Sequence, residues 1–475
     1  MKQRNYSYTL YSKIFLTVFI SGTFIVLSCN KPEKLKPVES VSADAGVSRI
    51  PAPGRPNIVI LLADDVGYDA IACNGNQSFE TPNINQLAQE GMRFTQCHGA
   101  PTCSPSRFMF VTGKYNFRNY TKWGVMNPNE KTFSNIAKDC GYKTYVAGKW
   151  QFDGGQTSIT NFGYDGYCLW DAQESVIPAS IYKSPKYYEN GVYVGKSVTD
   201  GMYGDDIFTS RILSFIQQNK ANNFFVYYPI GLCHYPFSPT PDNPEFADWA
   251  PGINNSNEAF FPSMIKYMDK KVGQIVDSLK AWQLYDNTIV MFVGDNGTPH
   301  GIYYYYNGVL TQGGKTLTTE AGTKVPLIVT WPNGITAGQV NNNLVSFTDF
   351  LPTIADATGT SIPASYGVID GKSFYNQLTG QQSTPRDWIF CHYNQLIENS
   401  FTNSEGGSAS EYKLAGQNKL RRWVQNTNYK LYDSTGKFYN IIDDIKEKSP
   451  ITASKITSQE QLIKDQFQSI MDTLH

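Results

Sequence analysis

The stretch Asn57-Ile58-Val59-Ile60-Leu61-Leu62-Ala63 decides the fold, and Asp64-Asp65 follows it directly. After Asn57 the stretch is apolar without a break, which is typical of a strand covered on both faces. In open α/β sheets, ligands bind beyond the carboxyl ends of the strands, where this aspartate pair would lie. The pair by itself has a second interpretation, because aspartates after a strand also cap turns and helices.

Three further strands are predicted, and polar side chains follow each of them. The strands alternate with helical patterns, which favours an α/β domain with a large, mostly parallel sheet sandwiched by helices. The predicted strands are residues 143–147, 224–229 and 288–293, and the helical patterns include residues 82–90 and 264–282.

The polar residues after these strands are Lys149, His234 and the pair Asp295-Asn296. Because the carboxyl ends of parallel strands lie at one edge of a sheet, we expect these residues to converge with Asp64-Asp65. Asp295-Asn296-Gly297 alone is also a good turn sequence. Carboxylates and an amide are oxygen ligands, which favour calcium over zinc. The five histidines of the chain, one of them C-terminal, leave little room for a multi-histidine zinc centre.

The composition limits the class of protein. Hydrophobic residues make up 41% of the 475 residues, so a sizeable core is available and wholesale disorder is excluded. The length suggests a large domain with a smaller companion. A net charge of -1 argues against a protein built around nucleic-acid phosphates, although a balanced total still permits a local cationic pocket.

Residues 1–28 resemble a signal peptide of the bacterial lipoprotein type. Basic residues precede an apolar run over residues 14–27, which is short for a membrane span, and Ser28-Cys29 follows. Lipidation of Cys29 would anchor the protein to a membrane; the alternative is an ordinary signal peptide with an incidental cysteine. Residues 29–54 are predicted to form a flexible tether. We expect an exported protein in the periplasm or at the outer membrane or cell surface, anchored by lipid.

Export changes the interpretation of the eight cysteines. If Cys29 carries lipid, seven remain, so at least one of them is unpaired or modified. An oxidising compartment permits disulfides, but their pairing stays open. None of the cysteines lies in a C-x-x-C pair, so neither a zinc knuckle nor a thioredoxin-like site is supported.

The motif Cys103-Ser104-Pro105-Ser106-Arg107 lies between the first two of the four strands. Proline suits the first turn of a helix, which places Cys103 at or before a helix N-terminus, where backbone amides favour an anion. Arg107, one turn later, can add a fixed positive charge. From these residues alone, Cys103 could be a nucleophile or a structural cysteine.

Cys-x-Pro-Ser-Arg is also the signature of the formylglycine-dependent (type I) sulfatases of the alkaline phosphatase-like superfamily. The chain resembles this family from residue 55 to about residue 444. The motifs that match, in chain order, are Pro56-Asn57-Ile58-Val59, Asp64-Asp65-Val66-Gly67-Tyr68, Thr81-Pro82-Asn83-Ile84, Gly91-Met92-Arg93-Phe94, Gly141-Tyr142-Lys143-Thr144, Ala147-Gly148-Lys149-Trp150, Asp286-Asn287-Thr288, Asp295-Asn296-Gly297, Gly313-Gly314-Lys315, Val325-Pro326-Leu327-Ile328, Asp349-Phe350-Leu351-Pro352-Thr353, Asp370-Gly371-Lys372-Ser373 and Tyr429-Lys430-Leu431-Tyr432.

The resemblance implies two domains after the tether. Residues 55–380 would form the sulfatase catalytic domain, and residues 381–475 would form a small C-terminal α+β domain with an antiparallel sheet. The implied activity is hydrolysis of sulfate esters. The exported, aromatic-rich chain makes a sulfated carbohydrate the expected substrate.

In this family a separate maturation enzyme oxidises the motif cysteine, here Cys103, to formylglycine. The aldehyde hydrates to a geminal diol; one hydroxyl attacks the sulfur of the ester, and the other then expels sulfate. This is covalent catalysis with a built-in exit, since a plain serine would keep the sulfate as a stable ester.

The resemblance also implies roles for the converging polar residues. One calcium ion would be bound by the modified Cys103 together with four oxygen ligands. Arg107 would hold the formylglycine side of the site, Lys149 and Lys315 would contact the sulfate, and His234 would bind sulfate and protonate the leaving alcohol. For His234, a buried structural histidine is the alternative; for Lys315, a solvent-facing loop lysine. The four oxygen ligands would be Asp64, Asp65, Asp295 and Asn296.

Gln151 departs from the family pattern, which commonly has a histidine at this position. Glutamine can form hydrogen bonds but cannot act as a base at neutral pH. Either another group assists sulfate expulsion, or the step needs none, or Gln151 mainly positions the diol. His300 could equally contact substrate or not. The run Tyr303–Tyr306 could form a sugar-stacking wall, pack internally or act as a lid.

Two other functions compete with a sulfatase. A phosphatase or phosphodiesterase of the same superfamily would normally need a Ser or Thr nucleophile and two metals with several histidine ligands. A non-catalytic lipoprotein that binds sulfated glycans on a sulfatase scaffold has only Gln151 in its favour. Which sugar, which sulfated position and whether attack is endo or exo stay open.

Overall fold

The structure is a computed structural model that describes residues 54–120, 124–152, 155–170, 180–394 and 420–474. The predicted signal peptide, nearly all of the tether and the lipidation site Cys29 lie outside these residues. Within them, no helix combines the length and the apolar character needed to cross a membrane.

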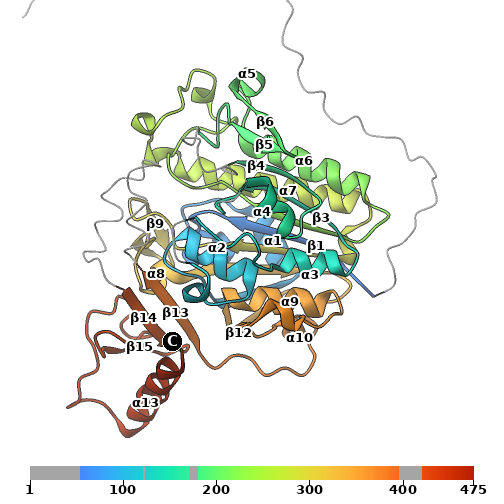
Figure 1. Cartoon of the computed structure of the whole chain (residues 1–475). Helices are drawn as coiled ribbons and strands as arrows, with labels where there is room; N and C mark the ends of the chain where they lie inside the picture. The colour runs from blue at the N-terminus through green and yellow to red at the C-terminus, as the bar shows by residue number, and fades with distance from the viewer. Residues whose placement is uncertain (1–53, 121–123, 153–154, 171–179, 395–419, 475) are drawn as a thin grey trace, which may run out of the picture. The chain divides into compact units, whose positions relative to one another are not determined.

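A ten-stranded mixed sheet forms the centre of the fold, and five adjacent strands, β8-β1-β7-β3-β4, are parallel to one another (Figure 1). The strand order is β12-β2-β11-β8-β1-β7-β3-β4-β5-β6. The bounds are β1 Asn57–Ala63, β2 Met92–His98, β3 Lys143–Lys149, β4 Gly166–Trp170, β5 Tyr187–Glu189, β6 Val192–Val194, β7 Phe224–Pro229, β8 Thr288–Gly294, β11 Lys324–Thr330 and β12 Gln339–Ser346.

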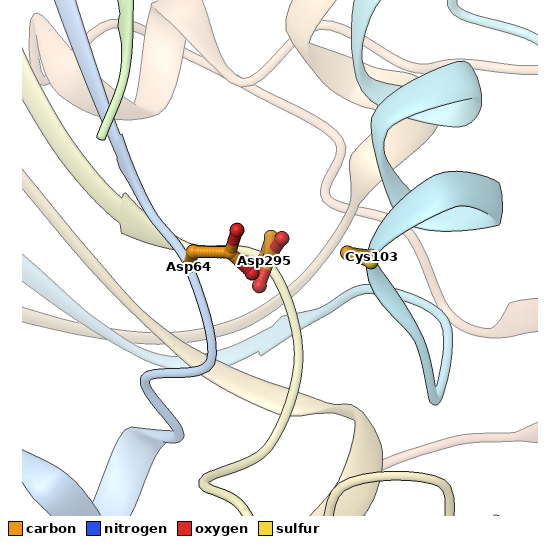
Figure 2. Close-up of side chains that lie close together, drawn as sticks. All are labelled: Asp64, Cys103 and Asp295. Carbon is orange, nitrogen blue, oxygen red and sulfur yellow. The ribbon is translucent and has the colours of Figure 1, made fainter. Parts of the chain in front are cut away.

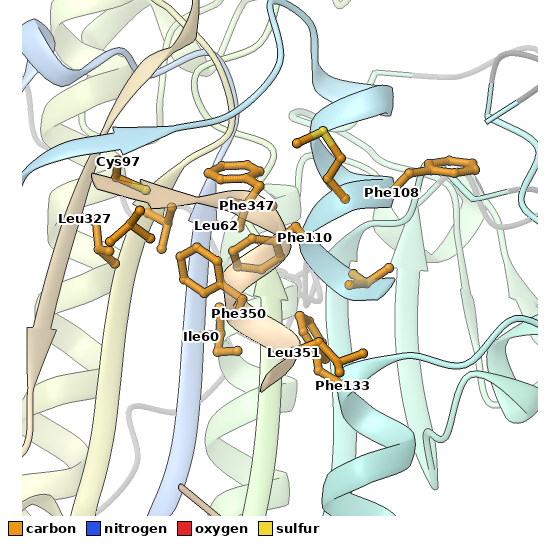
Figure 3. Packing of buried hydrophobic residues seen from close by; sticks show 14 of the residues in the cluster. Ile60, Leu62, Cys97, Phe108, Phe110, Phe133, Leu327, Phe347, Phe350 and Leu351 are labelled. Carbon is orange, nitrogen blue, oxygen red and sulfur yellow. The ribbon is translucent and has the colours of Figure 1, made fainter. Parts of the chain in front are cut away.

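Strand β1 is buried on both faces, as its apolar run predicts. Ile58, Ile60 and Leu62 belong to a core cluster on one face, and Val59 and Leu61 belong to the cluster on the other. Figure 3 shows the first face, where Ile60 and Leu62 pack near aromatic side chains of the covering helices. The first face is covered by α2 Cys103–Thr112, α3 Phe133–Asp139 and α9 Phe350–Ala357, the second by α1 Pro82–Glu90, α6 Gly204–Gln218 and α7 Phe261–Ala281.

The predicted elements are present with small changes at their ends. Strand β3 continues to Lys149, two residues beyond the prediction, and this brings Lys149 into the sheet itself. Helix α7 begins at Phe261, three residues earlier than predicted, because Pro262 is accommodated in its first turn. The short elements are α4 Gly155–Asn161, α5 Lys196–Thr199, β9 Tyr303–Tyr306, β10 Val309–Gln312, α8 Glu320–Thr323 and α10 Tyr375–Leu378.

A second, four-stranded antiparallel sheet lies near the C-terminus and has a long helix beside it. This small sheet contacts α8 and the residues before it through buried polar pairs. Gln425 Nε2 donates a hydrogen bond to Glu320 Oε1 at 2.7 Å, and Lys430 Nζ donates one to the carbonyl of Thr318. The predicted fold class, a large α/β sheet with a small antiparallel C-terminal part, is therefore confirmed. The elements are β13 Ile389–Asn394, β14 Leu420–Gln425, β15 Tyr429–Tyr432, β16 Phe438–Asn440 and α13 Ser458–Thr473.

Candidate active site

Four adjacent parallel strands, in the order β8-β1-β7-β3, deliver the polar side chains to one edge of the sheet. Ala63 of β1 is aligned with Gly294 of β8, so Asp64 and Asp295 come next to each other. Backbone hydrogen bonds fix this junction, because Asp295 N donates to the carbonyl of Ala63 at 3.0 Å. The predicted convergence thus arises from strand register.

Helix α2 brings Cys103 to the same edge. One oxygen each of Asp64 and Asp295 and the sulfur of Cys103 all lie within 4.8 Å of one another. Figure 2 shows the two carboxylates side by side at the strand ends, with Cys103 facing them from the start of α2. Asp65 joins the cluster through its backbone N–H, which donates to Asp295 Oδ1 at 3.0 Å, and Asn296 Nδ2 donates to Asp65 Oδ1 at 2.8 Å.

The oxygen atoms of this cluster fit a divalent cation. Among the described residues, none donates a hydrogen bond to Asp64 Oδ1 or to Asn296 Oδ1, although both atoms are buried. Buried acceptors without a donor are rare in proteins unless an ion or water completes them. Burial, followed by the charge of the neighbouring Asp64, raises the pKa of Asp295 to about 7, so ionisation of this carboxylate is unfavourable without a nearby cation. A hard cation held by Asp64, Asp65, Asp295 and Asn296 would bind the buried oxygens that lack a donor and would stabilise the ionised form of Asp295.

Three buried cationic side chains surround the carboxylates. Arg107 donates from Nε and Nη2 to Asp295 Oδ2 at 3.1 and 2.9 Å. Lys149 Nζ lies 2.7 Å from Asp64 Oδ2, and Lys315 Nζ lies 2.7 Å from Asp65 Oδ2. Lys315 is therefore buried in the site and is not a solvent-facing loop lysine. Three cations balance three carboxylates, so a bound divalent cation would leave the site positive and suited to an anion.

Burial disfavours the charged form of Asp64, but Lys149 and Arg107 more than compensate and hold its pKa below the usual value. Asp64 is therefore ionised and available as a cation ligand at neutral pH. Arg107 is locked between the two carboxylates, since its Nη2 also lies 3.3 Å from Asp64 Oδ2. Its guanidinium organises the acidic side of the site.

Cys103 is the first residue of α2 and is fully buried. Burial raises the pKa of its thiol to about 12, so the unmodified side chain is protonated at neutral pH and is a poor nucleophile. The loop before it is held by Ser106, whose hydroxyl accepts a hydrogen bond from Ala100 N at 2.8 Å, and by Thr316 N, which donates to the carbonyl of Pro101. The burial of the thiol, rather than these loop contacts, disfavours the interpretation of Cys103 as an ordinary thiolate nucleophile.

Gln151 contacts the motif cysteine directly: its Nε2 donates to Cys103 Sγ at 3.1 Å. Its backbone φ is 58°, in the left-handed region, which costs a non-glycine residue about 1 kcal/mol or more. The fold therefore holds the Gln151 side chain against Cys103 although the left-handed backbone conformation costs free energy. Of the three roles open for Gln151, the geometry favours positioning of the side chain at residue 103.

His234 follows β7 and is half-buried beside the cations of the site. Burial, followed by Lys149 and Lys315, lowers the pKa of its ring to about 4, so the ring is neutral at pH 7. Its Nδ1 lies 2.6 Å from the carbonyl of Tyr235, which makes Nδ1 the protonated nitrogen. As a general acid, His234 would need the negative charge of a bound substrate to raise its pKa.

Sequence reasoning missed Tyr182, which positions the His234 loop. The Tyr182 hydroxyl lies 2.9 Å from the carbonyl of Gly231 and 2.6 Å from that of His234. No motif marks this tyrosine, and only the fold brings it to the loop. His300 is half-buried; its Nδ1 lies 2.9 Å from Gln312 Nε2, and its substrate contact stays a prediction.

The seven described cysteines form no disulfide with one another. They are Cys73, Cys97, Cys103, Cys140, Cys168, Cys233 and Cys391.

Comparisons with known proteins show which family the chain matches. A family profile described as "Sulfatase" matches residues 56–360, and one described as "N-sulphoglucosamine sulphohydrolase, C-terminal" matches residues 314–466. An "Arylsulfatase" from Hemicentrotus pulcherrimus is 29% identical over 370 residues, which are 71% of this chain and 64% of that protein. The chain thus spans less than two thirds of the length of that relative.

Two other matches cover a larger share of the protein that this chain is compared with. An "N-acetylgalactosamine-6-O-sulfatase" from Bacteroides thetaiotaomicron is 28% identical over 423 residues, which are 70% of this chain and 78% of that protein. A solved structure of a protein in complex with its substrate D-glucosamine-2-N,6-O-disulfate has a TM-score of 0.68 and 18% identity. It covers 88% of this chain and 98% of its own, and it shows the same fold.

Proposed function

The chain belongs to the sulfatase family of sulfuric ester hydrolases, and from this premise we propose that it removes sulfate from a sulfated carbohydrate with a formylglycine made from Cys103. The observation that carries the proposal is the meeting of Cys103 with Asp64, Asp295 and three buried cations at one edge of the sheet. A separate maturation enzyme would act on Cys103 before it is buried in the folded chain.

The residues of the site have separable tasks in this proposal. Lys149, Lys315 and His234 bind the sulfate group, and Arg107 fixes the carboxylates. When bound, one calcium ion would supply positive charge to the sulfate oxygens, and the hydrated formylglycine would supply the nucleophilic hydroxyl. Preorganised positive charge around the transferred group is usually the largest catalytic contribution. Gln151 would orient the side chain of residue 103 through the hydrogen bond from Nε2.

A carbohydrate substrate is supported by the relative named N-acetylgalactosamine-6-O-sulfatase, although 28% identity does not transfer its sugar to this chain. Specificity would lie in segments outside the family motifs, such as residues 161–202, 302–310 and 394–423. Of these segments, residues 171–179 and 395–419 lie outside the described residues.

Sulfate release should be measured for the matured wild-type protein across a panel of defined sulfated saccharides, with the matching phosphorylated saccharides as controls. We expect sulfate release from at least one member and no phosphate release. Phosphate release in place of sulfate release would identify a phosphodiesterase. Binding of a sulfated saccharide without any release would identify a non-catalytic glycan-binding protein and would contradict the proposal.

We also propose that the protein is exported and anchored to a membrane through lipid on Cys29. The support is the basic and apolar segment that precedes Ser28-Cys29. Radiolabelled palmitate should enter the wild-type protein in the membrane fraction, whereas Cys29→Ala should take up no label. Equal labelling of both proteins would disprove the anchor.

A further inference from the structure

A short hairpin beside the candidate active site presents tyrosines to solvent. Strand β9 pairs antiparallel with β10, and residues 297–302 connect this hairpin to the site residues Asp295 and Asn296. The side chains of Tyr303 and Tyr305 are 58% and 53% exposed, whereas Tyr304 between them is 2% exposed. Large aromatic side chains are costly to expose in this way, so the exposed pair calls for an explanation.

The hairpin is rigidly mounted, so the exposure does not come from a loose segment. The Tyr304 ring packs against Phe79 with ring centroids 5.3 Å apart. Tyr305 N donates to Ser78 Oγ at 2.9 Å, and the carbonyl of Tyr305 accepts from Gln77 N at 2.9 Å. Buried and backbone contacts therefore hold the exposed rings in place.

The exposed face has a defined composition. Residues two apart on a strand share a face, so Tyr303 and Tyr305 lie together with their cross-strand partners Gln312 and Leu310. Leu310 is 59% exposed. From His300 to Gln312 the chain contains no acidic residue, lysine or arginine. The face formed by Tyr303, Tyr305, Leu310 and Gln312, called the tyrosine platform below, is thus uncharged and partly aromatic.

Backbone hydrogen bonds connect the tyrosine platform to the loop that carries Lys315. The base of the hairpin closes where Gly313 N donates to the carbonyl of Ile302 at 2.9 Å, and Lys315 N donates to that of Thr298 at 2.9 Å. A side chain at Gly313 would meet the carbonyl oxygen of Pro299 at 2.2 Å, so only glycine permits this close packing. The base of the hairpin and the backbone of Lys315 are therefore held by adjacent hydrogen bonds to the same short segment.

We propose that the tyrosine platform binds the sugar rings of the saccharide whose sulfate occupies the pocket, and this inference rests on the proposed function. A sugar ring has an apolar C–H face and a polar rim, which matches tyrosine rings flanked by the amide of Gln312. The platform carries no charge, so it would recognise neutral ring faces and leave sulfate recognition to the buried lysines. Its partner is thus the remainder of the substrate, outside the sulfate pocket.

The test compares the double variant Tyr303→Ala/Tyr305→Ala with Tyr303→Phe/Tyr305→Phe, which keeps the rings, and with Leu462→Ala. Leu462 is a 65% exposed residue on α13, outside the site and the specificity segments, and serves as the control for the loss of an exposed apolar side chain. We expect the alanine double variant to raise KM for the best saccharide of the panel on the order of tenfold, with little change in kcat. The phenylalanine variant and the Leu462 variant should behave like wild type.

Inhibition by inorganic sulfate shows whether a loss arises on the platform or in the pocket, because the free anion needs only the pocket. Its inhibition constant should not change in the alanine double variant. An unchanged KM, or an equal rise in KM and in the sulfate inhibition constant, would overturn the inference. A changed elution volume in size-exclusion chromatography with unchanged KM would instead assign the platform to contacts between copies of the chain.

Failure of the proposed function would be visible separately, as absence of sulfate release from every saccharide by the wild-type protein. In that case the platform is tested by calorimetric binding of the same saccharides to the wild-type protein and the alanine double variant. Weaker binding to the variant would support the inference, and equal binding, or no binding to either protein, would overturn it.

Discussion

Replacement of Cys103 by alanine is expected to abolish sulfate release, with a loss on the order of 10⁴-fold or more, as when a covalent nucleophile is removed. The side chain at residue 103 is placed at the N-terminus of α2, where its sulfur lies in one cluster with Asp64 and Asp295. Sulfate release from the best saccharide of the panel measures the effect. Mass analysis of the wild-type peptide should show that the thiol has become an aldehyde.

Two variants separate the loss of the nucleophile from loss of structure. Cys97→Ala makes the same chemical change at a buried cysteine in β2 and should keep activity. Gln151→Ala removes the hydrogen bond to residue 103, worth about 1 kcal/mol, and should lower kcat roughly tenfold while the conversion of Cys103 continues. Turnover by Cys103→Ala close to that of wild type would refute the proposed role of Cys103.

Removal of the metal by a chelator is expected to abolish activity and to lower the melting temperature, and calcium should restore both. The reason is the pair of buried oxygens, Asp64 Oδ1 and Asn296 Oδ1, that accept no hydrogen bond from the described residues. Binding at a hundredfold excess over Kd stabilises the folded state by about 2.7 kcal/mol. The calcium-dependent rise in melting temperature can be measured without any substrate.

Asp295→Asn should lose the calcium-dependent rise in melting temperature and most of the sulfatase activity. It removes one ligand charge and also the carboxylate that holds Arg107. Asp269→Asn is the matched control, because Asp269 is a buried aspartate whose oxygens accept from Asn83 N and Ile84 N at the start of α1. This control should be less stable but should still respond to calcium. The metal site would be contradicted if the melting temperature of the wild-type protein changed neither with chelator nor with calcium.

Much of the fold followed from local patterns. The unbroken apolar run of β1 requires cover on both faces, and the structure supplies it with helices from two core clusters. The positions of Asp64, Lys149, His234 and Asp295 after strands predicted their convergence, because parallel strands end at one edge. Strand ends were less predictable: β3 runs on to Lys149 because pairing with β4 continues to Trp170.

Other features could not be predicted from local sequence. Strands β8, β1, β7 and β3 are neighbours in the sheet although they are far apart and out of order in the chain. The left-handed backbone of Gln151, the support of the His234 loop by Tyr182 and the burial of Lys315 depend on contacts between distant segments. The hydrogen bonds that hold Tyr305 against residues 77–78 also join segments that are distant in the sequence.

The family and the α/β class follow from the sequence alone, which also predicts the residues that carry the chemistry and the edge of the sheet where they lie. These inferences depend on hydrophobic periodicity and on motifs whose residue types are dictated by the chemistry. Only the tertiary structure shows which cation pairs with which carboxylate, that Cys103 is buried beside Asp64 and Asp295, and which tyrosines face solvent. Those properties depend on distances of a few ångströms and on burial, which arise only when segments separated by many residues pack together.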